Sequence, residues 1–397
     1  MYSGLVKSRP LADPRLVALL QQLLSEESLP ALDRWFSHQA KSFRWSVADQ
    51  RTLWNSLRRA LTRGYGLLDQ ALAPMTSWPG FRNAIRGRAS EWALRADHPS
   101  PSEPTLESAG IPRWLGPALE SRARRSGWTT EEKMTFLTAQ DTPAPVHVRF
   151  RLGPEGEACA QRLTEAGHLE PSEVQGIFQL SGGRGLESGE DWKNGWVEIQ
   201  DAASQLCLGR LGLRPGQRVW DVCAGHGGKT LLAAHELRGK GALVATDISE
   251  SKLKVLKERV RRSGWQNIRL LAWDGERLPD FGPEMVSRGG FDRVIVDAPC
   301  TASGTWRRDP DGRYRLVPLS LIELAKHQQR LLRLGWSALK PGGRLAYVTC
   351  SWLPSEDEEI VDAFVAESGA TLVHQELLGL PAFDANTVFT AVLEKSP

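Results

Sequence analysis

The sequence lacks the features that would mark a membrane, secreted or zinc-binding protein. No apolar run reaches the ~18 residues that a membrane-spanning helix needs. The N-terminal segment MYSGLVKSRPLADPR has no apolar core followed by a small-residue cleavage site, so we expect no secretory signal. No C-x-x-C pair occurs among the five cysteines, which are Cys159, Cys207, Cys223, Cys300 and Cys350. This spacing argues against a zinc site and a disulfide framework, and we expect a reduced, cytoplasmic protein without a metal.

The sequence also lacks a large net charge, because 50 Lys and Arg residues nearly balance 47 Asp and Glu residues. The charges are unevenly placed, however. Residues 1–128 hold 18 basic and 11 acidic side chains, a net of +7, which leaves about −4 for the remainder of a chain whose net charge is +3. A basic N-terminal part fits a polyanionic partner such as RNA, but it fits a solvated helical face equally well.

The N-terminal part shows apolar residues recurring every three and four positions, as in helices. Four segments have this pattern, at residues 14–24, 29–36, 49–73 and 81–95, and they predict an α-helical domain over residues 1–96. Asp49 is the candidate N-cap of the third helix. The tryptophans of this region are expected in its core, although some could stack on bases; they are Trp35, Trp45, Trp54, Trp78 and Trp92.

Residues 97–112 are rich in Pro and Ser and are predicted to be a linker. A small α+β module is predicted over residues 113–194, with Thr129 or Thr130 capping its second helix. Its expected helices cover residues 113–128, 129–140 and 156–167, and its expected strands cover 142–152 and 174–180. Residues 181–195 are predicted to be a loop.

From Gly195 to the C-terminus, predicted strands alternate with helices. The strands are expected at 218–222, 242–247, 267–274, 291–299 and 343–350, and two of the helices at 249–264 and 319–339. This alternation predicts an α/β domain with a doubly wound, mostly parallel sheet, in which ligands bind beyond the carboxyl ends of the strands. Polar or reactive residues lie at or next to five such ends: Asp221, Asp247, Asp274, Asp297 and Cys350.

The segment VWDVCAGHGGKT, residues 219–230, predicts a buried strand, a glycine-rich turn and a helix that opens at Gly228 or Lys229. Glycines let a backbone approach a ligand closely, and a helix N-terminus offers unpaired N–H groups. Asp247 ends the next strand, where an acidic residue can bind a ribose. The turn matches G-x-G-x-x-G only weakly. Asp274 could bind an adenine edge or simply cap a helix.

Two cysteines follow neighbouring strands, Cys300 in DAPC and Cys350 in YVTCS. A lone cysteine is more often an inert buried thiol. Two thiols at adjacent ligand-side strand ends indicate chemistry instead. Cys223, within the glycine turn, is interpreted as a packing or backbone-contact residue and not as a nucleophile.

Five segments together resemble the Sun/Nop-type RNA (cytosine-C5)-methyltransferases, in order and at compatible spacing over residues 113–397. They are IQDAASQL (199–206), DVCAGHGGKT (221–230), DAPCTASGTWRRDPD (297–311), LKPGGRLAYVTCS (339–351) and PSEDEE (354–359). The resemblance implies a Rossmann-like, S-adenosylmethionine-dependent methyltransferase domain over 195–397, after the small RNA-contacting module and a diverged NusB-like RNA-binding domain. The chain departs from the family pattern at Ala302 and Asp357, and at Arg151, where an Asn is usual.

The resemblance also implies roles for individual residues. Cofactor contacts would come from Cys223, Ala224, Gly225, His226, Gly227, Gly228, Lys229, Asp247, Asp274 and Asp297. Lys229 and Asp297 would also belong to the catalytic set, Asp297 acting in protonated form at N3 of the base. Cys350 would be the nucleophile that adds to cytosine C6 and makes C5 reactive, and Cys300 would assist product release. Arg307 and Arg308 would bind RNA phosphates, or alternatively form surface ion pairs.

The resulting hypothesis is an S-adenosylmethionine-dependent enzyme that forms 5-methylcytosine in RNA, with 16S ribosomal RNA as first candidate substrate and transfer RNA as second. A monomer is expected, and RNA recognition is expected to rest on the N-terminal domains and the catalytic face. Two other classes stay open. One is a catalytically silent RNA-binding ribosome assembly factor. The other is a small-molecule methyltransferase or nicotinamide oxidoreductase, which detectable NADH binding without S-adenosylmethionine binding would support.

Overall fold

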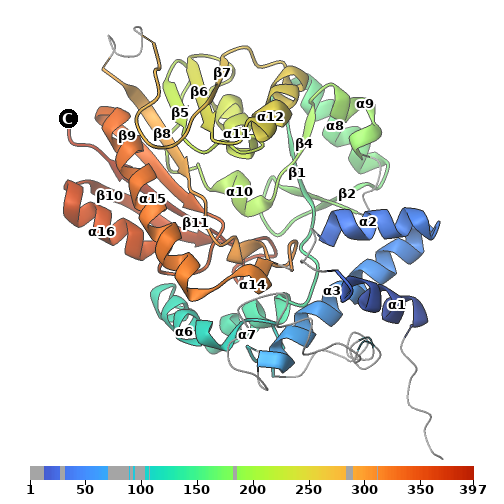
Figure 1. The fold of residues 1–397 in the computed structure, drawn as a ribbon. Coiled ribbons are helices and arrows are strands. Elements are labelled where there is room, and N and C mark those ends of the chain that lie inside the picture. The colour runs from blue at the N-terminus through green and yellow to red at the C-terminus, as the bar shows by residue number, and fades with distance from the viewer. Residues whose placement is uncertain are drawn as a thin grey trace, which may run out of the picture. The chain divides into compact units, whose positions relative to one another are not determined.

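The computed structural model divides the chain into two compact units, which are described separately (Figure 1). Unit 1 consists of Met1–Pro143 together with Trp306–Val317, and unit 2 consists of Ala144–Thr305 together with Pro318–Pro397. The structure describes residues 13–26, 32–69, 89, 93, 103–106, 108–181, 186–282, 289–310 and 312–397.

Unit 1 is helical in its described part. Its elements are α1 (Pro14–Leu23), α2 (Leu32–Ser42), α3 (Val47–Asp69), the 3-10 helix η1 (Arg113–Leu115), α6 (Gly116–Arg125), α7 (Thr130–Ala139) and α14 (Gly312–Arg315). Leucines spaced three and four apart on α1 pack into a core shared with α2 and α3. The first three predicted helices are therefore confirmed. Residues 81–95 lie outside the described residues except Ala89 and Ala93, both helical and buried.

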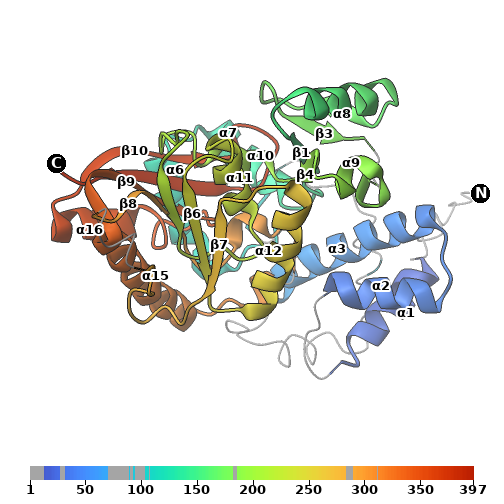
Figure 2. The ribbon, with the colours of Figure 1, turned by 90° about the horizontal axis from the view of Figure 1, so that it is seen from above.

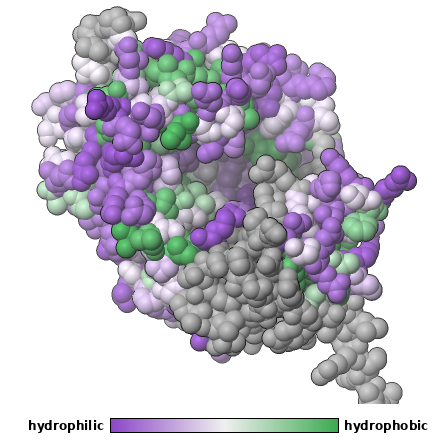
Figure 3. All heavy atoms as spheres, viewed as in Figure 1, coloured by the Kyte–Doolittle hydropathy of each residue, from purple (hydrophilic) through white to green (hydrophobic). Residues whose placement is uncertain are grey.

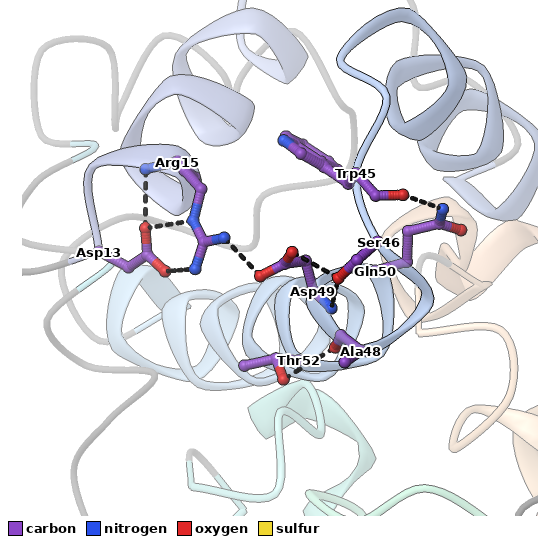
Figure 4. Close-up of polar contacts among 8 residues, drawn as sticks. All are labelled: Asp13, Arg15, Trp45, Ser46, Ala48, Asp49, Gln50 and Thr52. Atoms are coloured by element: carbon purple, nitrogen blue, oxygen red, sulfur yellow. Dashed lines mark hydrogen bonds and ion pairs between the residues drawn. The ribbon is translucent and has the colours of Figure 1, made fainter.

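Helix α3 begins after Ser46, and Ser46 is its cap (Figure 4). The Ser46 hydroxyl accepts the N–H of Asp49 at 3.1 Å and donates to the Asp49 carboxylate at 2.6 Å. The prediction of Asp49 as N-cap was therefore wrong by three residues, because a serine precedes it at the position that closes the first turn. Asp49 also accepts a hydrogen bond from Arg15 of α1 at 2.7 Å, which ties the two helices together.

The described tryptophans of this unit belong to its core, as predicted. Trp35 is buried, and Trp45 and Trp54 pack partly buried against the same cluster. Trp78 and Trp92 lie outside the described residues. The predicted cap of α7 is also confirmed, since Thr129 and Glu132 form a capping box.

The segment predicted as a linker is packed at its C-terminal end. Ala109 and Ile111 are buried, and the Ala109 carbonyl accepts a hydrogen bond from the buried Arg313 at 2.9 Å. Pro- and Ser-rich composition describes the first half of this segment, whereas the second half contributes to the core of unit 1.

Unit 2 contains a small antiparallel sheet with strand order β2-β3-β1-β4. Its strands are β1 (His147–Phe150), β2 (Leu169–Pro171), β3 (Phe178–Leu180) and β4 (Val197–Ile199), accompanied by α8 (Pro154–Glu165), η2 (Leu186–Ser188) and α9 (Glu190–Lys193). Two strands and the long helix were predicted. The other two strands span only three residues each, too few to show an alternating pattern, and two short helices lie in the predicted loop 181–195.

The main sheet of unit 2 has seven strands in the order β10-β11-β9-β8-β5-β6-β7. The strands are β5 (Arg218–Asp221), β6 (Ala242–Asp247), β7 (Ile268–Ala272), β8 (Phe291–Asp297), β9 (Leu339–Thr349), β10 (Thr371–Leu378) and β11 (Val388–Glu394). Strands β5 to β9 are mutually parallel, and β11 pairs antiparallel with both β9 and β10. The predicted doubly wound, mostly parallel sheet is confirmed, and the antiparallel pair at its edge was not predicted.

Helices cover both faces of this sheet (Figures 1 and 2). They are α10 (Ala202–Leu206), α11 (Gly228–Glu236) and α12 (Glu250–Ser263) on one face, and α15 (Pro318–Ala338) and α16 (Glu358–Ser368) on the other; η3 (Ser303–Thr305) follows β8. Alternate residues of each strand face opposite cores, so that Val219 packs with α11 while Trp220 packs with α15.

The compact units do not follow the predicted domain boundaries, which remain predictions. Chain breaks between units fall after residues 143, 305 and 317, whereas domains were expected to end at residues 96, 112 and 194. In the described part of the chain, no helix combines the length and apolarity required to cross a membrane. No group of three or more His, Cys, Asp or Glu side chains among the described residues is arranged to hold a metal ion.

Candidate active site

The five strand-end residues singled out above lie along one edge of the main sheet. Because β5 to β9 run parallel, their carboxyl ends meet there. Asp221, Asp247 and Asp297 end β5, β6 and β8, Cys350 follows β9, and Asp274 lies two residues beyond β7. The chain winds in opposite directions from β5 and β8, so these two neighbours form the topological switch point where ligands bind in such sheets.

The glycine turn after β5 has the backbone that its sequence predicts. Helix α11 begins at Gly228, and Gly227 before it has a φ of +88°. A Cβ on Gly227 would lie 2.1 Å from Leu256 Cδ1, so any other residue would strain the backbone and require the Leu256 side chain to shift. A Cβ built on Gly225 or Gly228 would meet nothing within 4 Å, and these glycines therefore border open space at the N-terminus of α11.

Side chains from three other segments hold this turn. Asp247 Oδ2 accepts the N–H of Gly225 at 2.8 Å. Gln200 donates to the Gly228 carbonyl at 3.1 Å, and Arg259 of α12 donates to the His226 carbonyl at 2.6 Å. The His226 side chain itself is exposed, so its carbonyl and not its ring is used by the fold.

Asp221 is fully buried beside the turn. Its Oδ2 accepts the Thr230 hydroxyl at 2.6 Å, while its Oδ1 has no hydrogen-bond partner among the described residues. Burial raises the pKa of Asp221 to about 7, with a smaller contribution from the nearby Asp297 charge. A buried carboxyl oxygen without a partner at this edge is a group that a polar ligand could satisfy.

Lys229 and Asp297 form an ion pair across the switch point, with 2.8 Å between Lys229 Nζ and Asp297 Oδ1. Burial by itself would lower the pKa of Lys229, but the charge and hydrogen bond of Asp297, together with smaller contributions from nearby cysteines, raise the pKa overall. The ammonium group therefore stays charged and fixes the position of the Asp297 carboxylate beside the glycine turn.

The two strand-end cysteines are in contact: Cys300 Sγ lies 3.3 Å from Cys350 Sγ. The interaction with Cys350, reinforced by burial, raises the pKa of the Cys300 thiol well above its usual value. The Cys300 thiol therefore stays protonated at neutral pH. Burial, with the charges of Asp221, Asp297 and Asp247, also raises the pKa of Cys223, in line with its interpretation as a packing residue.

Glu356 holds the two cysteine loops together. It is completely buried and accepts hydrogen bonds from the Thr301 N–H (2.9 Å) and hydroxyl (2.6 Å), from the Ser351 hydroxyl (2.7 Å) and from Gln328 of α15 (3.1 Å). Thr301 follows Cys300 and Ser351 follows Cys350, so one carboxylate fixes both thiols. The Ser303 and Ser351 hydroxyls, 3.0 Å apart, add a second link.

Sequence reasoning assigned no role to Glu356 or Gln328. The available signal was the acidic segment PSEDEE shortly after the second cysteine, but its first Glu is recognised as a bridge only through contacts with residues far away in the sequence.

The remaining predicted site residues differ in their surroundings. Asp274 is exposed, and its carboxylate accepts the N–H of Glu276 at 3.0 Å within a turn; no helix begins there in the described part of the chain, so its role stays a prediction. Arg307 is only 2% exposed and donates to both the carbonyl and the hydroxyl of Thr142 within unit 1. Because the Arg307 guanidinium is buried and hydrogen-bonded within unit 1, it is not available to bind a phosphate. The neighbouring Arg308 is exposed.

The strand order, the glycine turn at the switch point and the acidic residue ending β6 define the Rossmann-like fold of S-adenosylmethionine-dependent methyltransferases. Two solved structures share the fold. The crystal structure of PH0851 superposes with a TM-score of 0.71 at 22% identity, covering 98% of this chain and all of the other. That of NSun6 from Pyrococcus horikoshii with SFG has a TM-score of 0.58 at 18% identity, covering 70% and 98%.

The chain belongs to the family described as 16S rRNA methyltransferase RsmB/F, whose profile matches residues 209–385. The ribosomal RNA small subunit methyltransferase B of Pseudomonas putida is 31% identical over 316 residues, which cover 78% of this chain and 68% of the relative. The protein of the same name from Vibrio vulnificus is 33% identical over 246 residues, 60% and 56%. This confirms the resemblance drawn from the five motifs, although the chain spans only about half the length of several relatives it matches.

Proposed function

We propose that the chain is an S-adenosylmethionine-dependent RNA (cytosine-C5)-methyltransferase. The observation that carries the proposal is the contact of 3.3 Å between Cys300 and Cys350 at the carboxyl ends of the adjacent strands β8 and β9. Packing alone does not require two thiols at the ligand-binding edge of a parallel sheet. A reaction in which one sulfur attacks a base and the other takes part in its release does require them.

The residues around the glycine turn fit S-adenosylmethionine. Gly225 and Gly228 border open space, the N-terminus of α11 offers N–H groups, and Asp247 stands where a ribose-binding carboxylate is needed. The related NSun6 structure was determined with SFG, an analogue of this cofactor. When bound, S-adenosylmethionine supplies an electrophilic methyl group for C5 of the base.

Cys350 is the proposed nucleophile. Its thiolate forms a bond to cytosine C6, which moves electron density to C5. After C5 has gained its substituent, a water molecule takes the C5 proton and the C–H electron pair re-forms the C5–C6 double bond. The bond between sulfur and C6 breaks with its electron pair on Cys350, which restores the aromatic ring. Because Cys300 retains its proton beside Cys350, it is placed to donate a hydrogen bond to that sulfur and to assist its departure.

Asp297 and Lys229 are proposed to orient the base. The carboxylate is held at 2.8 Å by a lysine that stays charged, next to the glycine turn. In protonated form, Asp297 would donate a hydrogen bond to N3 of the base. As a carboxylate, Asp297 would instead accept a hydrogen bond from the amino group at C4.

The proposed substrate is 16S ribosomal RNA, by relation to proteins named ribosomal RNA small subunit methyltransferase B. Such a substrate places the protein in the cytoplasm. We further propose that the helices of residues 1–96 bind RNA as a diverged NusB-like domain, that residues 113–194 contact RNA, and that Arg308 binds a phosphate. Transfer RNA remains the alternative substrate.

The test uses purified protein, isotope-labelled S-adenosylmethionine, and two separate substrates: ribosomal RNA and transfer RNA from cells that lack the protein. Bisulfite sequencing then locates new 5-methylcytosine. We expect one modified site in 16S ribosomal RNA. A single site in transfer RNA would replace the substrate while keeping the chemistry. No incorporation into either pool or into small ribosomal subunits, with cofactor binding intact, would instead favour the silent assembly factor.

A further inference from the structure

A groove of about 840 Å³ opens on unit 2, where α9 and the following turn face α12 (Figures 1 and 2). Hydrophilic side chains cover most of this part of the surface in Figure 3. The groove is lined by Arg151, Glu187, Trp192, Lys193, Asn194, Val255, Glu258, Arg259, Arg261, Arg262 and Gly264. None of these residues belongs to the cysteine site.

Positive charge dominates the groove. Five of its lining side chains are cationic and two are anionic. The buried Glu198 below them pairs with Arg259 at 2.9 Å and also with Arg262, so a single carboxylate serves two guanidinium groups. Even when Glu198 is counted, the cations outnumber the carboxylates.

Two arginines of the groove lie over tryptophan rings. The Arg262 guanidinium lies 3.8 Å from the centroid of Trp192, and that of Arg151 lies 5.1 Å from the centroid of Trp265. Stacking fixes the plane of a guanidinium while leaving N–H groups at its edge for an acceptor. Planar, preoriented guanidinium groups suit the oxygens of phosphates.

The groove is connected to the catalytic edge. Helix α12 starts three residues after Asp247, and Arg259, which lines the groove, donates to the His226 carbonyl in the glycine turn. At 1.5 Å per residue, the helix from Ser249 to Arg262 extends roughly 20 Å. A nucleic acid strand of a few nucleotides can span that length.

We propose that this groove binds the sugar–phosphate backbone of the RNA strand whose cytosine occupies the cysteine site. The inference rests on the proposed function, to which it adds a path for the strand away from the target base. Lys193 and Arg261 supply exposed cations at the rim, while Arg262 supplies a cation that lies over Trp192. Ionic contacts of this kind act on any sequence, so the groove contributes affinity and direction and no base selectivity.

The test compares two double variants that remove the same charges from exposed helical positions. Lys193→Gln with Arg261→Gln changes the groove, where these residues pair with Glu190 and Glu258. Lys326→Gln with Arg333→Gln is the matched control on α15, where the partners are Glu323 and Glu367. Fluorescence anisotropy with a labelled single-stranded RNA oligonucleotide at several salt concentrations, without cofactor, gives the affinity of each protein.

We expect the groove variant to bind the RNA about ten-fold more weakly at ~0.1 M salt, with the slope of log K against log salt reduced by about 1.4, or ~0.7 per lost phosphate contact. The control variant should bind as the unchanged protein does. An equal loss of RNA affinity in both variants, or unchanged RNA affinity in both, would overturn the proposal. Unchanged affinity in both would instead favour an acidic protein as the partner of the groove. Because RNA binding is measured without methyl transfer, failure of the proposed reaction would be seen separately.

Discussion

Asp221 is a carboxyl group whose charge is poorly compensated by its surroundings. It is fully buried, receives one hydroxyl from Thr230, and leaves its second oxygen without a partner among the described residues. Its pKa of about 7 lies above the value of 3.8 for a free carboxyl, so folding favours the protonated form. Its stabilising contribution is thus complete below pH 3.8 and is lost as the pH rises through 7.

We predict that Asp221→Asn removes this pH dependence. Between pH 5 and pH 8 the free energy of unfolding of the unchanged protein should fall by about 2 kcal/mol relative to that of the variant, because only the carboxyl ionises. Urea unfolding of both proteins without ligand, at several pH values, measures the difference. If the difference between the two proteins stays constant across this range, Asp221 does not titrate there.

The cysteine pair allows a prediction that separates two residues in direct contact. Cys350→Ala should abolish methyl transfer, with a loss of at least ~1000-fold, while cofactor affinity is unchanged, because the attacking sulfur is removed. Cys300→Ala should accumulate a covalent RNA adduct that survives denaturing electrophoresis, since the release step is slowed. If the Cys350→Ala variant forms the adduct and the Cys300→Ala variant does not, then Cys300 is the nucleophile and Cys350 assists release.

At the scale of elements, the glycine turn and α12 must fit each other closely. A Cβ on Gly227 would meet the side chain of Leu256, which is completely buried. Two helices that follow consecutive strands are thereby brought together directly beside the cofactor edge. This contact explains the glycine at this position by packing as well as by its positive φ.

Gly227→Ala should accordingly lower the free energy of unfolding by about 3 kcal/mol, from strain at positive φ plus overpacking against Leu256. Gly342→Ala is the matched control, since Gly342 also has a positive φ, of +69°, but a Cβ there meets nothing within 4 Å. The control should lose only about 1 kcal/mol. Denaturant unfolding measures both, and equal losses would show that the contact with Leu256 relaxes without cost.

Regular elements were predictable where their pattern extends over enough residues. Helix α12 shows its apolar face, its Ser249 cap and its Gly264 end in the sequence, and all three are present. Strand β11 was not predicted, although it is buried along almost its whole length as the predicted strand β6 is. Strands β2 and β4 are too short for any period to be seen.

At the scale of the whole molecule, the candidate site was predictable because the sheet topology places its residues next to one another. Parallel strands bring their carboxyl ends to one edge, so Asp247, Asp297 and Cys350 could be grouped without knowledge of any side-chain contact. The Glu356 bridge and the burial of Arg307 were not predictable in this way. Both depend on particular contacts between residues that are distant in the sequence, and neither follows from a local pattern.

The segment Trp306–Val317 belongs to unit 1 although it follows the first cysteine loop, and its two adjacent arginines should therefore behave differently. Arg307→Ala should lower the free energy of unfolding by about 2 kcal/mol, because the buried guanidinium donates to Thr142 and Pro143. Arg308→Ala should change stability by less than about 0.5 kcal/mol and weaken RNA binding instead. Thermal unfolding and RNA titration of both variants test this, and the reverse assignment of effects would contradict it.

The two-segment composition of unit 1 also orders events on the ribosome. Its first segment ends at Pro143, but Trp306 and Arg313, which are both buried in the finished unit, are synthesised much later. Protein synthesis adds roughly 5–20 residues per second, so on the order of ten seconds or more pass between the synthesis of the first segment of unit 1 and that of its second segment. During that interval β5 to β8 have already emerged, so the catalytic sheet begins to assemble before unit 1 can close.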